Sequence, residues 1–187
     1  MPQSPPIRLR RDVGLVDLEI GHAAVMFRWV CDPTISRNIG LTKEPSLEKT
    51  RQWIAATRED PRVQPFAIQM ADRHVGNVVL DQIEQGLSTA RLSIYIGESD
   101  VRASGVGTTA VYRVLERAFN TLLLHKVWLT VHPDNFPAIN VYSRLGFQLE
   151  GIHRDEFLRD GRRVSALYMG LLKPEFHALP VIEDTQS

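Results

Sequence analysis

Residues 90–122 read ARLSIYIGESDVRASGVGTTAVYRVLERAFNTL, and this stretch decides the fold. It predicts a strand over Arg91–Ile96, then a short loop, then a long helix that runs to Leu122. The apolar residues of the helix recur every three or four positions, as in a helix that packs on a core, and they are Val106, Ala110, Val111, Val114, Leu115, Ala118 and Phe119. The stretch therefore predicts a strand–loop–helix unit.

The loop of this unit contains Gly105 and Gly107, separated by one residue. Glycine lets backbone N–H groups approach a ligand closely, where a Cβ would obstruct it. The helix N-terminus that follows adds free N–H donors and the positive end of the helix dipole, both of which suit a phosphate. We therefore predict that the loop binds a pyrophosphate.

The neighbouring elements indicate which ligand carries that pyrophosphate. The pattern Gly-x-Gly-x-x-Ala over Gly105–Ala110 also occurs in dinucleotide-binding folds, but those folds need parallel βαβ units. Three antiparallel strands are expected upstream here, which disfavours a dinucleotide. A Walker-type nucleotide loop needs Gly-Lys-Ser/Thr, and no such tripeptide follows the glycines.

The residues before this stretch predict one strand, two helices and a polar loop between the helices. The first helix ends at Asp32-Pro33, because the residue before a proline avoids the helical conformation. The second helix opens at Ser46, a good N-cap residue, and buries Trp53 and Ile54. The predicted ranges are Ile7–Arg11 for the strand, Asp17–Val30 for the first helix and 34–45 for the loop.

The remaining apolar runs predict a sheet of mixed direction. Phe66–Met70, Val75–Ile83 and Arg91–Ile96 alternate with a period of two and have short connections, so we expect an antiparallel meander. The elements expected after the long helix are the strand Lys126–Val131, the short helix Ala138–Arg144, and the strands Phe147–Arg154 and Ser165–Leu172. The fold class is α/β, with a mixed sheet and helices on both faces.

Length and composition fit one globular domain. The chain has 187 residues, 43% of them hydrophobic, and a formal net charge of +0. We therefore expect no nucleic-acid partner and no membrane partner. We expect residues 1–6 to be a disordered lead-in, residues 7–174 to form the domain, and residues 175–187 to be a loose tail.

Cysteine and histidine usage bears on compartment and metal binding. The single cysteine, Cys31, excludes an internal disulfide, which fits a reducing compartment. With no apolar segment long enough for a signal or a span, we predict a cytoplasmic protein. The six histidines lack metal-ligand spacing, so we predict no metal site.

Four pieces of the sequence together resemble the GNAT acetyltransferases. The resemblance covers roughly residues 7–174 and is greatest with the branch that holds ribosomal-protein N-terminal, spermidine and amino-sugar acetyltransferases. The loop matches the family signature (Gln/Arg)-x-x-Gly-x-(Gly/Ala), and Asn135 lies seven residues before Tyr142, as in that branch. The four pieces are LSIYIG, the loop Arg102–Gly107, VHPDN ending at Asn135, and Ala138–Phe147 with Tyr142 in its middle.

This resemblance implies a donor, a fold and a set of binding residues. The donor is acetyl-CoA, and the fold is a mostly antiparallel sheet with a splayed strand pair that holds the coenzyme. Asn135 is expected to bind the pantetheine arm, and Tyr142 to contact the coenzyme and protonate the thiolate. The strand backbone at Ile94, Tyr95 and Ile96 is expected to pair with the pantetheine. The loop residues expected at the pyrophosphate are Arg102, Ala103, Ser104, Gly105, Val106 and Gly107.

The acceptor is expected to be a small-molecule primary amine. The polyamine enzymes of the family have a glutamate where this chain has Arg91, and by alternation Ser93 shares its face. A positive or hydroxylic lining suits an acceptor with negative charge, such as a nucleotide-linked amino sugar. An exposed, purely structural Arg91 explains the residue equally well. Trp29 is a further candidate wall of the acceptor pocket, by resemblance.

The sequence leaves the proton acceptor and the class of acceptor open. His74, Glu84, Glu98 and His153 are candidate bases, and water can relay the proton instead. His132 follows a buried strand and is a weaker candidate for the lining of the cleft, whereas His22 and His125 have structural explanations. The runner-up functions are N-terminal acetylation of a protein and coenzyme A binding without turnover. Dimers are common in the family, so a homodimer is compatible with the sequence.

Overall fold

A seven-stranded sheet in the order β2-β3-β4-β5-β6-β8-β7 forms the centre of the molecule. The computed structural model describes residues 5–41, 43–159 and 161–183. A separate parallel pair, β1-β9, joins the two ends of the described chain. The strands are β1 Ile7–Leu9, β2 Val13–Asp17, β3 Gln64–Met70, β4 Arg73–Glu84, β5 Thr89–Ile96, β6 Lys126–Val131, β7 Gln148–Arg159, β8 Arg162–Leu172 and β9 Val181–Glu183.

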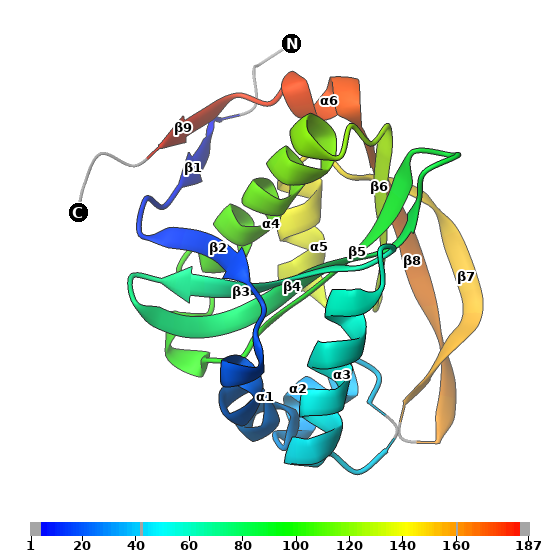
Figure 1. Ribbon diagram of the computed structural model, residues 1–187. Helices are drawn as coiled ribbons and strands as arrows, with labels where there is room; N and C mark the ends of the chain where they lie inside the picture. The colour runs from blue at the N-terminus through cyan, green and yellow to red at the C-terminus, as the bar shows by residue number, and fades with distance from the viewer. Residues whose placement is uncertain (1–4, 42, 160, 184–187) are drawn as a thin grey trace.

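Helices cover both faces of this sheet. Figure 1 shows α1, α2 and α3 gathered on one side of the sheet and α4 and α5 on the other. Among the described helices, none combines the length and the apolar character that crossing a membrane would need. The helices are α1 Ala23–Val30, α2 Pro33–Asn38, α3 Leu47–Glu59, α4 Val106–Glu116, α5 Phe136–Arg144 and α6 Lys173–His177.

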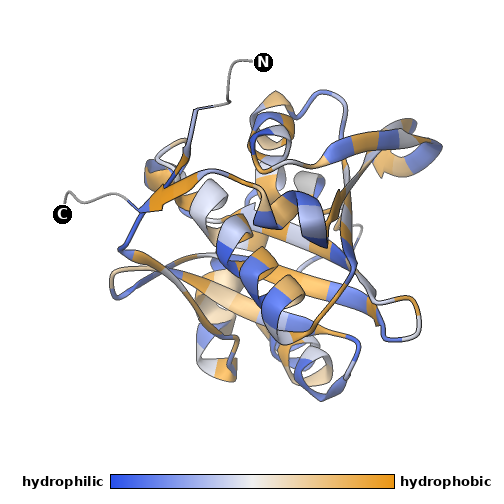
Figure 2. Ribbon diagram, turned by 90° about the horizontal axis from the view of Figure 1, so that it is seen from above, coloured by the Kyte–Doolittle hydropathy of each residue, from blue (hydrophilic) through white to orange (hydrophobic). Residues whose placement is uncertain are grey.

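Two apolar clusters hold the helices to the sheet. The larger cluster lies between α4 and the sheet, and the smaller one beneath α1 and α3. Strand β3 serves both, because Phe66 and Ile68 belong to the larger cluster and Ala67 to the smaller. Figure 2 shows apolar strands through the middle of the molecule and hydrophilic residues on the outer helices and hairpins.

Strands β5 and β6 diverge, and this divergence, which we call the fork, is the feature that positions the site. The two strands are parallel and pair only from Thr89–Lys126 to Arg91–Trp128. Beyond Arg91, β5 stays bound to β4 as far as Ile96. Strand β6 instead stays bound to β8 along its whole length. The sheet therefore opens where its two halves follow different partners.

The strand–loop–helix unit and the meander predicted from the sequence are confirmed. Strands β3, β4 and β5 are consecutive and antiparallel. The seven apolar residues predicted to face the core from the long helix are each at most 1% exposed. The helix itself ends in a π-helical turn, Arg117–Thr121.

The prediction of one helix over Asp17–Val30 was wrong over its first part and right over Ala23–Val30, which forms α1. Asp17 is the last residue of β2, which pairs with β3 from Val13–Met70 to Asp17–Phe66. Sheet pairing with β3 outweighs the local helical pattern, so the regular helix α1 begins only at Ala23.

The prediction of a loop over residues 34–45 was also wrong at its start. Asp32 accepts a hydrogen bond from the Thr34 N–H at 2.8 Å, and Pro33 occupies the first turn of α2. The Asp-Pro pair that ends one helix therefore starts another, because proline suits the first helical position.

The second predicted helix is present, with a difference at its buried face. The Ser46 hydroxyl accepts a hydrogen bond from the Lys49 N–H, which confirms the predicted N-cap of α3. Ile54 is fully buried as predicted, but Trp53 is 42% exposed. Adjacent helical residues point in different directions, so only one of the two can face the core.

The residues after Pro174, expected to be a loose tail, form structure as far as Glu183. They complete α6, in which Phe176 is 4% exposed, and they add β9. Strand β9 pairs with β1, a partner about 170 residues away that local patterns do not indicate. The predicted lead-in falls largely on residues 1–4, which lie outside the described residues.

Candidate active site

The loop between β5 and α4 has the backbone that an anion site needs. Gly105 is the N-cap of α4 and has φ of +90°, a left-handed conformation that favours glycine. Ala103 also has a positive φ, of +60°. By helix geometry, the first N–H groups of α4 have no partner within the helix. A Cβ on Gly107 would have only one neighbour within 4 Å, Ile96 Cγ1 at 3.9 Å, so this edge of the loop is open.

Arg102 ties the start of this loop to the end of β5. Its Nε donates to the Ile96 carbonyl oxygen at 3.3 Å and its Nη2 to the Gly97 carbonyl oxygen at 3.2 Å. The structure therefore places the Arg102 backbone on the loop, as predicted, and turns the side chain toward the strand.

Arg10 lies behind the loop and was missed in the sequence. Its Nη1 donates to the Ser104 carbonyl oxygen at 3.2 Å, across 94 residues of chain. The only sequence signal was a basic residue that alternates with apolar ones at the start of the chain, a pattern that does not identify a site.

The edge of β5 that faces the fork has no strand partner from Leu92 to Ile96 within the described chain. The backbone groups of Ile94, Tyr95 and Ile96 therefore offer an edge to which an extended amide chain can add. The Tyr95 side chain packs against the smaller apolar cluster on one face of the sheet, so it is not part of this edge. Its hydroxyl accepts a hydrogen bond from Asn77 Nδ2 at 2.6 Å, and burial raises its pKa.

Asn135 lies directly before α5, and Tyr142 lies within it. Asn135 is the N-cap of the helix, and its Oδ1 accepts a hydrogen bond from the Ala138 N–H at 3.3 Å. Capping uses the carbonyl side of the amide and leaves the Nδ2 group, which has no hydrogen-bond partner among the described residues, to donate to a ligand. The structure thus assigns Asn135 a capping role that spacing alone did not indicate.

Tyr142 points into the larger apolar cluster rather than into solvent. It is 7% exposed, and its ring meets that of Phe147 edge to face at 5.7 Å. Burial raises the pKa of Tyr142 to about 12. The phenol therefore keeps its proton at neutral pH, as a general acid must.

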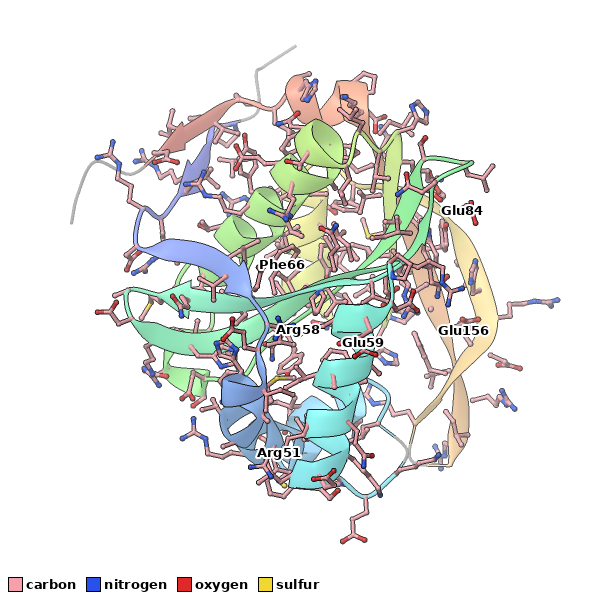
Figure 3. The ribbon with its side chains drawn as sticks, viewed as in Figure 1. Arg51, Arg58, Glu59, Phe66, Glu84 and Glu156 are labelled. Atoms are coloured by element: carbon pink, nitrogen blue, oxygen red, sulfur yellow. The ribbon has the colours of Figure 1, made fainter. Side chains whose placement is uncertain are left out.

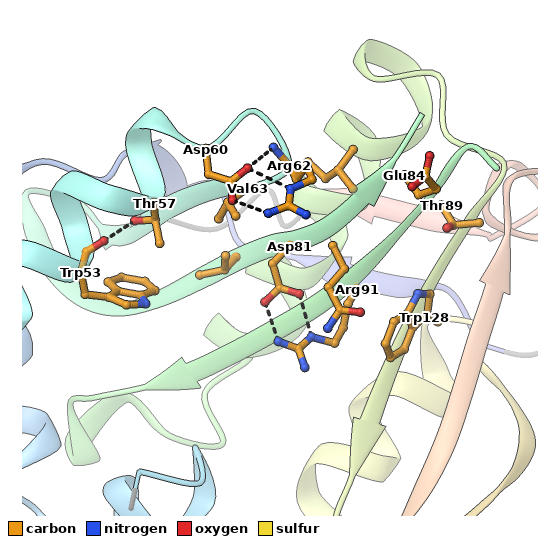
Figure 4. A pocket seen from close by; sticks show the side chains of 13 residues that line it. Trp53, Thr57, Asp60, Arg62, Val63, Asp81, Glu84, Thr89, Arg91 and Trp128 are labelled. Atoms are coloured by element: carbon orange, nitrogen blue, oxygen red, sulfur yellow. Dashed lines mark hydrogen bonds and ion pairs between the residues drawn. The ribbon is translucent and has the colours of Figure 1, made fainter. Parts of the chain in front are cut away.

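A pocket of about 620 Å³ opens on the α3 face of the sheet, beside the point where the fork begins. In Figure 4, Trp53 of α3 and Trp128 of β6 stand on opposite sides of it, with the ion pair of Asp81 and Arg91 between them. The residues that line it are Trp53, Thr57, Asp60, Arg62, Val63, Val79, Asp81, Gln82, Ile83, Glu84, Thr89, Arg91 and Trp128.

The Arg91 guanidinium forms the floor of this pocket with Asp81. Its Nε and Nη2 donate to the two Asp81 carboxylate oxygens at 2.7 and 2.8 Å. The pair raises the pKa of Arg91, and Glu156 adds to the rise. Figure 3 shows Glu156 and Glu84 on the same side of the molecule. Arg91 thus reaches the predicted acceptor side, but a carboxylate neutralises much of its charge.

The structure does not place Trp29 in this pocket. Trp29 is 4% exposed, donates from Nε1 to Glu98 at 2.9 Å, and lies flat against Gly97, where a Cβ would come within 2.0 Å of its ring. It is a core residue of the smaller cluster. Ser93 is exposed on the part of β5 that β6 leaves unpaired, on the same face as Arg91.

The candidate bases lie in different surroundings. Glu98 is held by Trp29, Arg28 and Arg73. Burial opposes ionisation of Glu98, but the hydrogen bonds from Trp29 and Arg73 outweigh it and lower the pKa. Glu84 is exposed at the rim of the pocket, where its Oε1 accepts a hydrogen bond from the Gly86 N–H.

Two histidines are buried enough for their pKa to fall. Burial lowers the pKa of His74, whose Nε2 lies 3.0 Å from Asn77 Oδ1. Burial and the nearby Arg159 lower the pKa of His132, which directly follows β6 and is 8% exposed. His153 is 45% exposed and stacks on Tyr168. In the part of the chain that the structure describes, no three His, Cys, Asp or Glu side chains gather as a metal site.

Comparison with known proteins gives one family for most of the chain. Residues 12–148 match the family model described as acetyltransferase (GNAT) domain. The chain is also similar to the L-amino acid N-acetyltransferase AaaT of Escherichia coli, with 39% identity over 123 residues, which are 65% of this chain and 75% of that protein.

Solved structures agree in fold. The spermidine N-acetyltransferase of Vibrio cholerae, in complex with CoA and spermine, has a TM-score of 0.83 at 23% identity, over 89% of this chain and 98% of that one. Mycobacterium smegmatis RimJ, in complex with CoA-disulfide, has a TM-score of 0.81 at 22% identity, over 87% and 83% of the two chains.

Proposed function

Because the chain belongs to the GNAT acetyltransferases, which take their acetyl group from acetyl-CoA, we propose that its fork binds the coenzyme and its pocket binds the amine. The observation that carries this proposal is the fork itself. The unpaired edge of β5 leads directly into a loop with a left-handed glycine and the N-terminus of α4.

The fork, the loop that follows β5 and the start of α5 each suit a different part of the coenzyme. The N–H groups of Gly105, Val106 and Gly107 suit the pyrophosphate. The backbone of Ile94–Ile96 suits the amides of the pantetheine arm, which adds to β5 as an extra strand. The Asn135 amide supplies a further donor at the start of α5. The coenzyme, when bound, supplies an acetyl thioester.

The chemistry then needs few side chains. An amine from the pocket adds to the thioester carbonyl, and a backbone N–H of β5 stabilises the oxyanion that develops. Tyr142 donates its proton to the departing thiolate. The amine loses its surplus proton to water or to a nearby base. Glu84, which lines the pocket, is a candidate for that base.

The pocket favours a small amine that also carries a carboxylate, as an amino acid does. Two of the five N–H groups of Arg91 donate to Asp81, and the others are available to bind an anionic group. Asp81 and Glu84 attract the ammonium form of the amine. Trp53 and Trp128 give an apolar or aromatic side chain two walls to pack on. The 39% identity with an L-amino acid N-acetyltransferase supports the same choice.

Other acceptors fit the pocket less completely. A nucleotide-linked amino sugar, the acceptor predicted from the sequence, also brings anionic groups to Arg91. A polyamine brings only cations, so Arg91 would face like charge, although Asp81 reduces that repulsion. A protein N-terminus has the α-amine and the side chain of an amino acid but carries an amide in place of the α-carboxylate.

Thiol release from acetyl-CoA tests this proposal with a matched pair of acceptors. L-Phenylalanine and 2-phenylethylamine share the ring and the amine, and only the first has a carboxylate. We expect kcat/KM for phenylalanine to be about tenfold higher, because one charge-assisted contact is lost in the other. Arg91→Gln should abolish this preference.

Three results would change the proposal. Equal rates for the matched pair in the wild-type protein would remove Arg91 from acceptor recognition. Faster turnover of spermidine or of a UDP-linked amino sugar would replace the amino acid as acceptor. Absence of thiol release with every amine, despite coenzyme binding, would favour a binding module without turnover.

A further inference from the structure

Arg10, the residue directly after β1, contacts both α4 and the loop in front of it. The Arg10 backbone N–H donates to Thr109 Oγ1 at 3.1 Å, and Thr109 is fully buried. The guanidinium Nη1 donates to the Ser104 carbonyl oxygen at 3.2 Å. Arg10 therefore touches both the helix and the loop that precedes it.

Asp12 holds the guanidinium in place. Its two carboxylate oxygens accept hydrogen bonds from Arg10 Nε at 2.9 Å and Nη2 at 2.7 Å. The hydrogen bond from Arg10 lowers the pKa of Asp12, so the carboxylate is charged at neutral pH. The stem of Arg10 lies beside Gly105, where a Cβ would be 3.7 Å from Arg10 Cδ.

Peptide geometry links this contact to the ligand side of the loop. The Ser104 carbonyl and the Gly105 N–H belong to one peptide unit, and no cis peptide bond occurs in the described chain. In a trans unit the C=O and the N–H point in opposite directions. Fixing the Ser104 oxygen on the Arg10 side therefore aims the Gly105 N–H away from Arg10.

We propose that Arg10, oriented by Asp12, is a positioning residue that sets the loop in its pyrophosphate-binding form. The proposal rests on the proposed function, in which the loop binds the pyrophosphate of the coenzyme. Asp12 neutralises the guanidinium, so the role depends on geometry rather than on charge. Lysine cannot bind Asp12 through two atoms and Ser104 through a third, so it does not replace arginine here.

Two ligands separate positioning of the loop from general damage to the site. Coenzyme A contains the pyrophosphate, whereas pantetheine contains only the arm that lies along β5. We expect Arg10→Ala to weaken binding of coenzyme A about tenfold in calorimetry and to leave binding of pantetheine unchanged. Arg10→Lys should behave like Arg10→Ala, and Asp12→Asn should show a smaller loss of the same kind.

Arg11 offers a matched control in the next position. Its side chain is 64% exposed, and its Nε lies 3.6 Å from Glu183 on β9. Arg11→Ala removes one positive charge without touching the loop, so coenzyme A binding should stay within twofold of wild type.

The outcomes distinguish this inference from the proposed function. If Arg10→Ala and Asp12→Asn both keep the wild-type preference for coenzyme A over pantetheine, Arg10 does not position the loop. Equal losses for both ligands would assign Arg10 a merely structural role. If the wild-type protein itself shows no preference for coenzyme A over pantetheine, the loop is not the pyrophosphate site and the proposed function fails first.

Discussion

In the proposed function, the two sides of the fork recognise their ligands by different means. On the coenzyme side the groups are backbone N–H and C=O, presented by a left-handed glycine and by the unpaired edge of β5. On the acceptor side they are side chains, two tryptophans and an ion pair, which come from α3, β4, β5 and β6. Backbone recognition of this kind survives most substitutions, whereas each residue of the pocket can change independently. The same fold can therefore keep one donor while its acceptor varies.

The largest effect should come from Tyr142, the proposed acid for the departing thiolate. Tyr142→Phe removes one oxygen from a buried ring and leaves the packing on Phe147 intact. We expect kcat to fall by about 10²-fold or more, because general-acid catalysis usually accelerates a reaction by at least that factor. Coenzyme binding should stay unchanged. Steady-state thiol release and calorimetry measure the two quantities. A kcat within threefold of wild type would show that another group protonates the thiolate.

The coenzyme side should be sensitive to backbone conformation. Gly105→Val places a β-branched residue at φ of +90°, which L-residues avoid at a cost of about 1–2 kcal/mol. We expect coenzyme A affinity to fall by about 10- to 30-fold with little change in the acceptor KM at saturating coenzyme. Gly14→Val is the control, because a Cβ there has no neighbour within 4 Å and φ is not positive.

The acceptor side should be sensitive to side-chain truncation without loss of stability. Trp53 is 42% exposed at the pocket, so Trp53→Ala should raise the acceptor KM about fivefold and change the melting temperature little. Trp29 is 4% exposed, and Trp29→Ala should instead destabilise the fold by about 3–5 kcal/mol. Thermal melts and acceptor kinetics on both variants test this contrast. Equal melting temperatures would show that Trp29 is not a core residue.

The smallest effect concerns pH. His74 and His132 both have a lowered pKa in the folded state, chiefly through burial. The unfolded chain then binds more protons below about pH 6.5, so stability is full above that pH and falls as the pH drops through the folded-state values. Melts at pH 5 and pH 7.5 should differ, and His132→Asn should reduce the difference. A melting temperature independent of pH over this range would contradict the assignment.

The same contrast explains what the sequence could predict. The loop Arg102–Gly107 and the face of α4 depend on glycine positions and on helical periodicity, which are local, so both were predicted. The pocket depends on which residues of α3 and β6 meet across the sheet, so Trp53 was expected in the core and Trp29 at the acceptor. Arg91 was found by its position, but its partner Asp81 lies ten residues away on the neighbouring strand and was not foreseen.

The ends of the chain show the same limit. Strand β9 exists because it meets β1, and α2 exists because Asp32 caps the Thr34 N–H. Arg10 reaches the loop only through the fold, since 94 residues separate it from Ser104. Local patterns carry no information on such contacts, which form when distant segments pack together.

Hydrogen–deuterium exchange with and without coenzyme A tests the central claim most directly, because it measures backbone N–H groups. The claim predicts slower exchange over Ile94–Ile96 and Ala103–Gly107 in the complex, and unchanged exchange in the segment Trp53–Arg62 beside the acceptor pocket. Unchanged exchange over residues 94–107 with coenzyme A bound would contradict it.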